Sequence, residues 1–343
     1  MNNIHYPSIT VWEITLKCNL KCLHCGSSAG EKTTDELSTK EGVKLCRDLK
    51  EIGCKGVALM GGELFLRKDW YEIGREIKDL GMNLSVVSNG FCNVEDIIPK
   101  LTKLETDCVT VGLDGLADTH DYIRGVKGSF EKAVEFMRAS NEAGLTTNAI
   151  TTVHKINFEE IPKMTEFILE DVGVDWQLQE AIPIGRFPLE LMLSEEEYYS
   201  LGMFISSLQK KYSKERVTGG HNFGFHSKVI PNLSLYPEWN GCYAGISVLG
   251  IRCNGDVVGC LTLSDEFVEG NIRDRSIIDI WNDPNSFAYN RRFKKEMLGE
   301  KCIDCKYRLS CKGGCTCRSF STTGKIHNDP HCFYRFEKKK NNI

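Results

Sequence analysis

The stretch ITVWEITLKCNLKCLHC, residues 9 to 25, joins a strand-like run to three closely spaced cysteines. Residues 9–16 are rich in β-branched and apolar side chains, which predicts a first β-strand. Cys18, Cys22 and Cys25 follow it with the spacing C-x3-C-x2-C. Because a tetrahedral metal site normally takes four ligands, three thiols on one loop leave a fourth position to be explained.

Beyond this loop, strand-like and helix-like segments alternate up to residue 215, the pattern of repeated βα units around a parallel sheet. Ser38, with Glu41 three residues later, is a typical helix start. The pattern predicts six strands, at 9–16, 55–60, 83–89, 107–114, 146–153 and 174–180, and six helices, at 38–53, 69–80, 94–105, 129–143, 158–171 and 194–214. Six units are too few to close a full barrel, so we expect an α/β fold with an open, partial (β/α)6 TIM-like barrel. Its active site should lie at the carboxyl ends of the strands.

The pattern changes near residue 217. Residues 216–240 are rich in Gly, Pro and Asn and predict a connector, and nine of the sixteen cysteines lie between Cys242 and Cys332. Two strand-like runs around Asn254-Gly255 predict a β-hairpin. We therefore expect a barrel at 1–215, a connector at 216–240, a small cysteine-rich domain at 241–335 and a basic tail at 336–343.

Composition excludes several classes of protein. The chain has 343 residues, with 43 basic and 47 acidic side chains and a net charge of −4, so a nucleic acid is not expected as its partner. The sequence shows no secretory signal and no apolar run long enough to cross a bilayer. We expect a cytoplasmic protein without a membrane partner. In that compartment clustered thiols indicate metal binding or catalysis rather than disulfides.

The thiol loop suits a 4Fe-4S cluster, because three thiolates would hold three irons and leave the fourth open to a small molecule. Alternatives are a zinc site with a distant fourth ligand such as His24, or cysteines without a metal. Gly61-Gly62-Glu63, after the second predicted strand, offers bare backbone and a carboxylate that suit an ammonium group. A simple turn is the alternative for that motif.

At these residues the chain resembles the radical S-adenosylmethionine (SAM) superfamily. The family's cysteine motif matches Cys18, Cys22 and Cys25, and its glycine-glycine-glutamate motif matches residues 61–63. The resemblance implies that the open iron binds the amino and carboxylate groups of SAM. One electron then splits the sulfonium to give a 5'-deoxyadenosyl radical, so the cofactor supplies the hard chemistry and the protein directs it.

The sequence departs from the family pattern at two places in these motifs. His24 replaces the usual aromatic residue before the third cysteine and is expected to pack against the cluster or the adenine, and Leu64 replaces the usual proline.

Residues 111–115 and 120–125 resemble the family segment that holds the SAM carboxylate through a serine and an arginine twelve residues apart. Here Gly112 stands at the serine's position, so Arg124 is expected to contribute more to binding the SAM carboxylate. Ser88 and Asn148 are further candidates for polar SAM contacts at strand ends.

The later cysteines read C-x12-G-x4-C, then C-x2-C-x5-C-x3-C, then a last cysteine. This pattern resembles the SPASM domain of radical SAM enzymes that mature peptides and proteins. A zinc ribbon would use four of these positions and leave the rest without a role. The resemblance implies two auxiliary Fe-S clusters, of the 4Fe-4S kind. The outer one would take Cys302, Cys305, Cys311 and Cys332, and the inner one Cys242, Cys260 and Cys315.

The inner cluster is one ligand short. Cys253 or Cys317 could complete it, or the open position could bind substrate. Either thiol could also be a small buried side chain or a hydrogen-atom donor in catalysis. The remaining cysteines, on barrel elements, are expected to fill the core: Cys46, Cys54, Cys92 and Cys108.

Auxiliary clusters can carry an electron away from the substrate, so we expect net oxidation of the substrate. The main hypothesis is an oxygen-sensitive oxidoreductase of ribosomal-peptide maturation that forms a side-chain cross-link. Its partners would be a precursor peptide, a flavodoxin- or ferredoxin-type reductant and, unless its own surface suffices, a separate peptide-recognition protein. Alternatives are a peptide epimerase, a small-molecule dehydrogenase, an Fe-S electron carrier or an anaerobic sulfatase maturase. Leu261 disfavours the last, because those enzymes carry an aspartate after the second cysteine of the domain.

The sequence assigns no general base, since Asp114, Glu180 and Glu63 all lie at predicted strand ends. Trp239 and Tyr243, near the domain junction, could line a substrate channel or pack in the core.

Overall fold

A single ten-stranded sheet organises the molecule in the computed structural model, which describes residues 5–30, 35–220, 222–236 and 239–340. Its order is β10-β9-β8-β1-β2-β3-β4-β5-β6-β7, and β1 to β7 are parallel. The first six strands are Ile9–Thr15, Gly56–Gly61, Asn83–Ser88, Cys108–Gly112, Thr147–Val153 and Asp175–Glu180. The consecutive parallel order confirms the predicted partial barrel.

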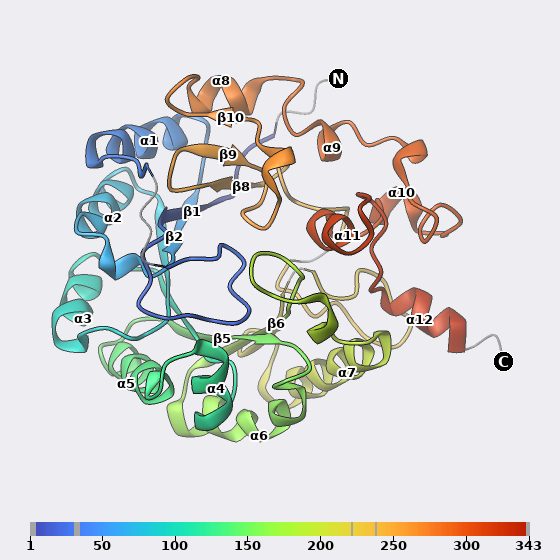
Figure 1. Ribbon diagram of the computed structural model, residues 1–343, viewed down its shortest axis with the longest axis horizontal. Coiled ribbons are helices and arrows are strands. Elements are labelled where there is room, and N and C mark those ends of the chain that lie inside the picture. The colour runs from blue at the N-terminus through green and yellow to red at the C-terminus, as the bar shows by residue number, and fades with distance from the viewer. Residues whose placement is uncertain (1–4, 31–34, 221, 237–238, 341–343) are drawn as a thin grey trace.

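Helices cover the outside of this curved sheet (Figure 1). They are α1 (Thr39–Glu51), α2 (Trp70–Asp79), α3 (Val94–Lys103), α4 (Ala117–Arg124), α5 (Ser129–Glu142), α6 (Ile161–Glu166) and α7 (Glu195–Tyr212). The start of α1 confirms the expected cap, because Ser38 Oγ accepts the Glu41 N–H at 3.3 Å while the Glu41 carboxylate accepts the Ser38 N–H at 2.7 Å.

Three elements differ from the sequence prediction. The short helix α4 was not predicted. The helix expected at 158–171 is divided into a 3-10 turn at Phe158–Glu160, α6 and a π-helix at Phe167–Val172. Strand β7 (Val217–Gly219) extends the sheet inside the predicted connector, because its backbone pairs with β6.

The cysteine-rich region continues the same sheet. Its hairpin of β8 (Val248–Ile251) and β9 (Asp256–Val258) is antiparallel, as predicted, and β8 pairs in parallel with β1. The other elements of this region are β10 (Gly270–Asn271), α8 (Ile277–Asn282), α9 (Ala288–Arg291), α10 (Arg308–Cys311), α11 (Thr316–Thr323) and α12 (Phe333–Lys340). Further 3-10 turns lie at Leu64–Leu66, Leu189–Leu191, Asp265–Phe267 and Lys295–Met297.

Helix α12 packs against α7 and runs across the boundary expected at residue 335, so residues 336–340 of the expected basic tail are helical. Lys339 and Lys340 form ion pairs with Glu195 and Glu196 at the start of α7. The carboxyl-terminal end of the described chain thus returns to the barrel (Figure 1).

The main core lies between the sheet and its helices. Fully buried side chains there include Trp12, Leu45 and Trp176, and Cys46 and Cys54 are buried among them, as predicted. Cys92 is only partly buried against this core, and Cys108 is also partly buried. Within the described ranges, no helix is long and apolar enough to cross a membrane.

Candidate functional site

The first cysteine loop leaves the carboxyl end of β1 and is closed at its base by backbone hydrogen bonds. Cys18 N donates to Gly30 O at 3.1 Å, and Gly30 N donates to Leu16 O at 2.9 Å. Within the loop, the backbone N–H of Leu20 lies 3.4 Å from Cys18 Sγ and that of Ala29 3.3 Å from Cys25 Sγ. Backbone donors therefore already face two of the three sulfurs, as they would face ligating thiolates.

The glycines of the second motif let the end of β2 lie directly against this loop. Gly62 N donates to Thr15 O at 2.8 Å, and Glu63 N donates to Lys17 O at 2.7 Å. A Cβ at Gly62 would lie 2.2 Å from Lys17 O and 2.9 Å from Cys18 Cβ. No larger residue fits without moving the backbone that leads into Cys18.

Glu63 is buried and held by the end of β3. Its carboxylate accepts the Ser88 hydroxyl at 3.0 Å, the Asn89 N–H at 2.8 Å and the Phe65 N–H at 3.2 Å. Burial raises the pKa of Glu63 to about 7, even though these hydrogen bonds oppose the shift. A cation bound beside the carboxylate would offset that cost. Ser88 therefore contacts Glu63 in this structure and acts through it.

Arg124 lies in the space beside Gly112. A Cβ at Gly112 would lie 2.0 Å from Arg124 Nη2, and this nitrogen is 2.6 Å from Asp114 Oδ2. Arg124 Nη1 lies 3.9 Å from Cys22 Sγ. The guanidinium thus occupies the position where a serine side chain would lie, within reach of the cysteine loop.

His24 faces the same carboxylate, with Nε2 3.2 Å from Asp114 Oδ2. Burial lowers the pKa of His24 to about 4, so its imidazole is neutral at pH 7. Burial alone would raise the pKa of Asp114, but Arg124 and His24 bring it down to about 2. Asp114 is therefore an ionised partner of Arg124, which argues against its candidacy as a general base.

Asn148 does not lie near these groups. It is the second residue of β5 and pairs with Thr110 and Asp175, so it is at the amino end of the strand. The cysteine loop leaves the opposite end of the sheet. The expectation that Asn148 contacts SAM at a strand end is therefore corrected, because the strand runs in the direction that places it at the other edge.

Glu180, the last residue of β6, is also engaged elsewhere. Its carboxylate accepts hydrogen bonds from Arg318 and His331 of the cysteine-rich region. Arg318 is fully buried and donates to both oxygens of Asp329, at 2.7 and 2.9 Å. This network joins the two parts of the chain and leaves Glu180 poorly suited to the role of base.

The four cysteines expected around the outer cluster line one cavity of about 250 Å³: Cys302, Cys305, Cys311 and Cys332. They come from the segment around α10 and from the residue before α12. Four thiols on the wall of a single cavity are a suitable donor set for a 4Fe-4S cluster.

The inner cysteines gather in a second small cluster. Cys315 and Cys317 are buried there beside Ala244 and Leu263, and Cys242 and Cys260 pack against them. Cys317 Sγ donates to Thr262 O at 2.8 Å. Cys253 lies outside this cluster, in the loop after β8, where its carbonyl accepts the Leu37 N–H at 2.8 Å. The structure thus brings Cys317, and not Cys253, to the three expected ligands.

No three described His, Cys, Asp or Glu side chains converge as they would around one metal ion. A four-iron cluster instead takes its thiolates on separate iron atoms, so its ligands need a wider spacing.

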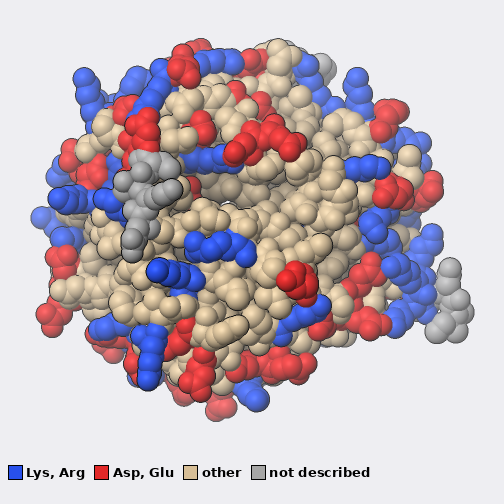
Figure 2. Space-filling model, in the orientation of Figure 1, with Lys and Arg blue, Asp and Glu red and all other residues tan. Residues whose placement is uncertain are grey.

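A cavity of about 570 Å³ lies between the barrel and the cysteine-rich region. Its walls are the carboxyl-terminal end of β1 with Leu16 after it, the end of the cysteine loop, the turn at 183–185, and, from the cysteine-rich region, residues 252, 261–265, 317 and 320–321. In Figure 1 these segments approach one another near the centre of the view, and the same face is hollowed and mostly uncharged at its middle in Figure 2. Sequence reasoning missed its polar residues Glu13, Ser27 and Arg252. A charged residue inside the apolar strand at 9–16 was the available signal.

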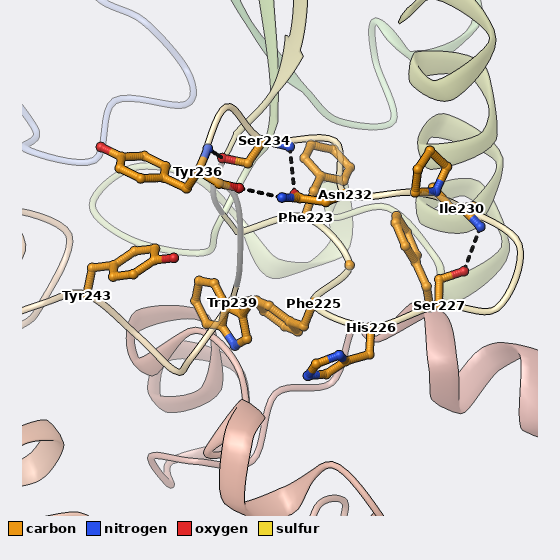
Figure 3. Close-up of a pocket in the computed structure, with 13 residues that line it drawn as sticks. Phe223, Phe225, His226, Ser227, Ile230, Asn232, Ser234, Tyr236, Trp239 and Tyr243 are labelled. Atoms are coloured by element: carbon orange, nitrogen blue, oxygen red, sulfur yellow. Dashed lines mark hydrogen bonds between the residues drawn. The ribbon is translucent and has the colours of Figure 1, made fainter. Parts of the chain in front are cut away.

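Trp239 and Tyr243 line a different, aromatic pocket of about 210 Å³, together with Phe223, Phe225 and Tyr236 (Figure 3). Trp239 Nε1 donates to Cys311 O at 3.2 Å, which ties this pocket to the outer cysteines. Neither aromatic residue lines the central cavity.

Comparison with known proteins bears on this arrangement. Residues 12–168 match the sequence model of the radical SAM superfamily, and residues 242–306 match that of SPASM, an iron-sulfur cluster-binding domain. The chain therefore carries a radical SAM domain followed by a SPASM domain. It is an enzyme of the SPASM type, whose cofactors are SAM, a SAM-binding 4Fe-4S cluster and auxiliary Fe-S clusters.

Two curated relatives and one solved structure are similar over almost the whole chain. The AdoMet-dependent heme synthase of Methanosarcina barkeri is 29% identical and covers 97% of this chain and 98% of its own length. The mycofactocin maturase MftC of Mycolicibacterium smegmatis is 28% identical, over 95% of this chain and 82% of its own. Streptococcus suis SuiB bound to S-adenosylmethionine has a TM-score of 0.77 at 18% identity, covering 97% of this chain and 77% of its own. The likeness to SuiB supports the fold.

The residues present fit the radical SAM cofactors. The donor set is three thiols on one loop, the backbone around Gly62 has no room for a side chain, and burial still raises the pKa of Glu63 to about 7 although its hydrogen bonds and Arg124 oppose the shift. The domain boundaries expected at residues 215 and 240 remain a prediction. Strand β8 of the cysteine-rich region pairs with β1, so both sides of these boundaries share one sheet.

Proposed function

We propose that this radical SAM enzyme oxidises a ribosomally made peptide and forms a side-chain cross-link in it. The observation that carries the proposal is the cavity of about 570 Å³ that the cysteine loop borders on one side and the cluster of inner cysteines on the other. A peptide segment placed there would lie between the site of hydrogen abstraction and a route for the departing electron. The maturase MftC, and SuiB, whose structure bound to the precursor peptide SuiA is known, support a peptide substrate.

A heme-type substrate is the competing possibility, because the M. barkeri relative is named a heme synthase. A porphyrin carries carboxylate side chains and calls for cationic partners. The charged residues on the cavity wall are Glu13, Arg252 and Asp265, and Arg252 is already paired with Asp265 at 2.5 Å. A wall with more acidic than basic groups favours a peptide over a polycarboxylate.

The proposed ligands of the first cluster are Cys18, Cys22 and Cys25. Gly61, Gly62 and Glu63 would hold the amino group of SAM, Ser88 would fix Glu63, and Arg124 would reach the SAM carboxylate from above Gly112. When bound and reduced, this cofactor pair supplies a 5'-deoxyadenosyl radical. His24 lies within the loop and would orient Asp114, and its predicted contact with the cofactor remains a prediction.

The outer auxiliary cluster is assigned to Cys302, Cys305, Cys311 and Cys332, which share one cavity. The inner one is assigned to Cys242, Cys260 and Cys315, with Cys317 as the fourth thiolate because it lies in the same cluster of side chains. Cys317 also borders the central cavity, so the inner cluster would face the substrate through this residue. A flavodoxin- or ferredoxin-type protein is the proposed electron donor.

Mass spectrometry tests this proposal. The anaerobically reconstituted enzyme, with SAM and a reductant, is incubated with each short peptide that reading frames beside its gene encode and, separately, with iron coproporphyrin. Loss of two hydrogens from the peptide is the expected result. A peptide of unchanged mass, or conversion of the porphyrin alone, would overturn it, and inversion of a stereocentre at constant mass would indicate an epimerase.

A further inference from the structure

Glu13 lies on the wall of the central cavity, in the strand that leads into the cysteine loop. Successive side chains of a strand point to opposite faces. Trp12 faces α1, since a Cβ at Gly42 of that helix would lie 3.1 Å from Trp12 Cη2. Glu13 therefore points to the other side of β1, into the interior of the partial barrel, where the cavity opens.

The local backbone supports this orientation. The register between β1 and β2 shifts between Glu13 and Thr15, the kind of irregularity that redirects side chains beside active sites. Only 5% of Glu13 is exposed to solvent. Ser27, in the cysteine loop, is near enough to its carboxylate to lower the pKa of Glu13. Yet Oε1 of Glu13 has no hydrogen-bond partner within the described part of the chain.

A buried carboxylate oxygen without a donor is costly, and such a group usually has a ligand or a catalytic role to explain it. The three carboxylates considered as bases from the sequence are all engaged. Asp114 pairs with Arg124, Glu180 with Arg318, and Glu63 with Ser88 and Asn89. Glu13 differs from them because its Oε1 has neither a hydrogen bond nor an ion pair within the described residues and because it lines the cavity.

We propose that Glu13 accepts the proton that leaves the substrate when the new bond closes. This inference rests on the proposed cross-linking reaction. Cross-linking breaks one C–H bond and one X–H bond of the peptide and forms one C–X bond. One hydrogen leaves as an atom to the 5'-deoxyadenosyl radical, and the other leaves as a proton to Glu13 Oε1. The remaining electron passes to a one-electron acceptor of the iron-sulfur class.

The surroundings suit a proton acceptor. Burial raises the pKa of Glu13, and Ser27 and Arg252 offset part of that shift. The ionisable groups that face Glu13 across the cavity are Arg252 with its partner Asp265, and the Cys317 thiol of α11. A carboxylate with a raised pKa accepts a proton near neutral pH more readily than an exposed one.

The test measures coupling between SAM cleavage and product. In the Glu13→Gln variant, product formed per 5'-deoxyadenosine released should fall by a factor on the order of 10², while iron content and the EPR spectra of the clusters stay as in the parent. Glu13→Asp should restore part of the coupling, with a shifted pH profile. Glu135→Gln removes an exposed carboxylate of α5 and is the matched control, expected to match the parent. Unchanged coupling in Glu13→Gln would overturn the proposal.

A second measurement does not depend on the substrate. A hydrophobic carbodiimide should modify Glu13 in the holoenzyme, and peptide mapping should show Asp114 and Glu180 unmodified because guanidinium groups hold them. If the parent enzyme modifies no peptide, the proposed function is wrong. The labelling alone then decides whether Glu13 is a reactive carboxyl of the cavity. An unlabelled Glu13 would overturn its assignment as a reactive carboxyl of the cavity.

Discussion

Arg318 Nε lies 2.7 Å from Asp329 Oδ1, and the same guanidinium donates to Glu180 at the end of the barrel's sixth strand. Asp329 in turn accepts the backbone N–H of Cys315 at 2.8 Å, and His331 next to Cys332 also contacts Glu180. One buried cation therefore connects the barrel to a ligand of each proposed auxiliary cluster. The two parts of the enzyme are joined by charge as well as by the shared sheet.

Replacing Arg318 should destabilise the enzyme strongly. Arg318→Met would leave Glu180 and Asp329 buried without their partner, a loss of about 3–5 kcal/mol for a broken buried pair. The measurement is thermal unfolding of the reconstituted enzyme under anaerobic conditions. Lys100→Met, which removes an exposed ion pair on α3, is the control and should change the melting temperature little. Equal melting temperatures for the Arg318 variant and the parent would contradict this role.

Gly62→Ala should disrupt the first cluster site. The added methyl would lie 2.2 Å from Lys17 O, so the backbone before Cys18 must move. Iron content and 5'-deoxyadenosine release should both fall, the latter by about tenfold or more. Gly30→Ala, at the other end of the loop, is the control, because a Cβ there would meet no atom of the described residues within 4 Å. Similar losses in both variants would show that the loop is merely sensitive to any change.

Gly112→Ala should weaken SAM binding. The methyl group would occupy the place of Arg124 Nη2, which is held 2.6 Å from Asp114. Moving the guanidinium would both deprive Asp114 of its ion pair with Arg124 and displace the proposed partner of the SAM carboxylate. We expect the Kd for SAM, measured by anaerobic equilibrium dialysis, to rise by about tenfold. An unchanged Kd would mean that Arg124 does not reach the cofactor from this position.

Cys317→Ala and Cys253→Ala separate the two candidates for the fourth inner ligand. Only Cys317 lies with Cys242, Cys260 and Cys315. Its loss should lower iron content and alter the EPR signal of one auxiliary cluster, whereas Cys253→Ala should retain the parent's iron and spectrum. The opposite pattern would assign the ligand to Cys253.

The cluster motifs and the order of the barrel strands could be predicted from the sequence because both are local patterns of spacing and periodicity. Asn148 shows where strand-end reasoning fails, since a polar residue near the wrong end of a parallel strand lies at the opposite edge of the sheet. The roles of Cys317, Glu13 and Arg318 depend on segments far apart in the chain. Glu180 and Arg318, for example, are 138 positions apart, and no local sequence pattern predicts a contact between them.

The release of 5'-deoxyadenosine tests the central claim most directly. The reconstituted enzyme is reduced with dithionite in the presence of SAM, and the nucleoside is quantified by liquid chromatography. We predict release by the parent and none by the Cys18→Ala/Cys22→Ala/Cys25→Ala variant, which keeps the cysteines of the second domain. Equal release by both, or none by a parent that carries its iron, would contradict the assignment of SAM cleavage to this loop.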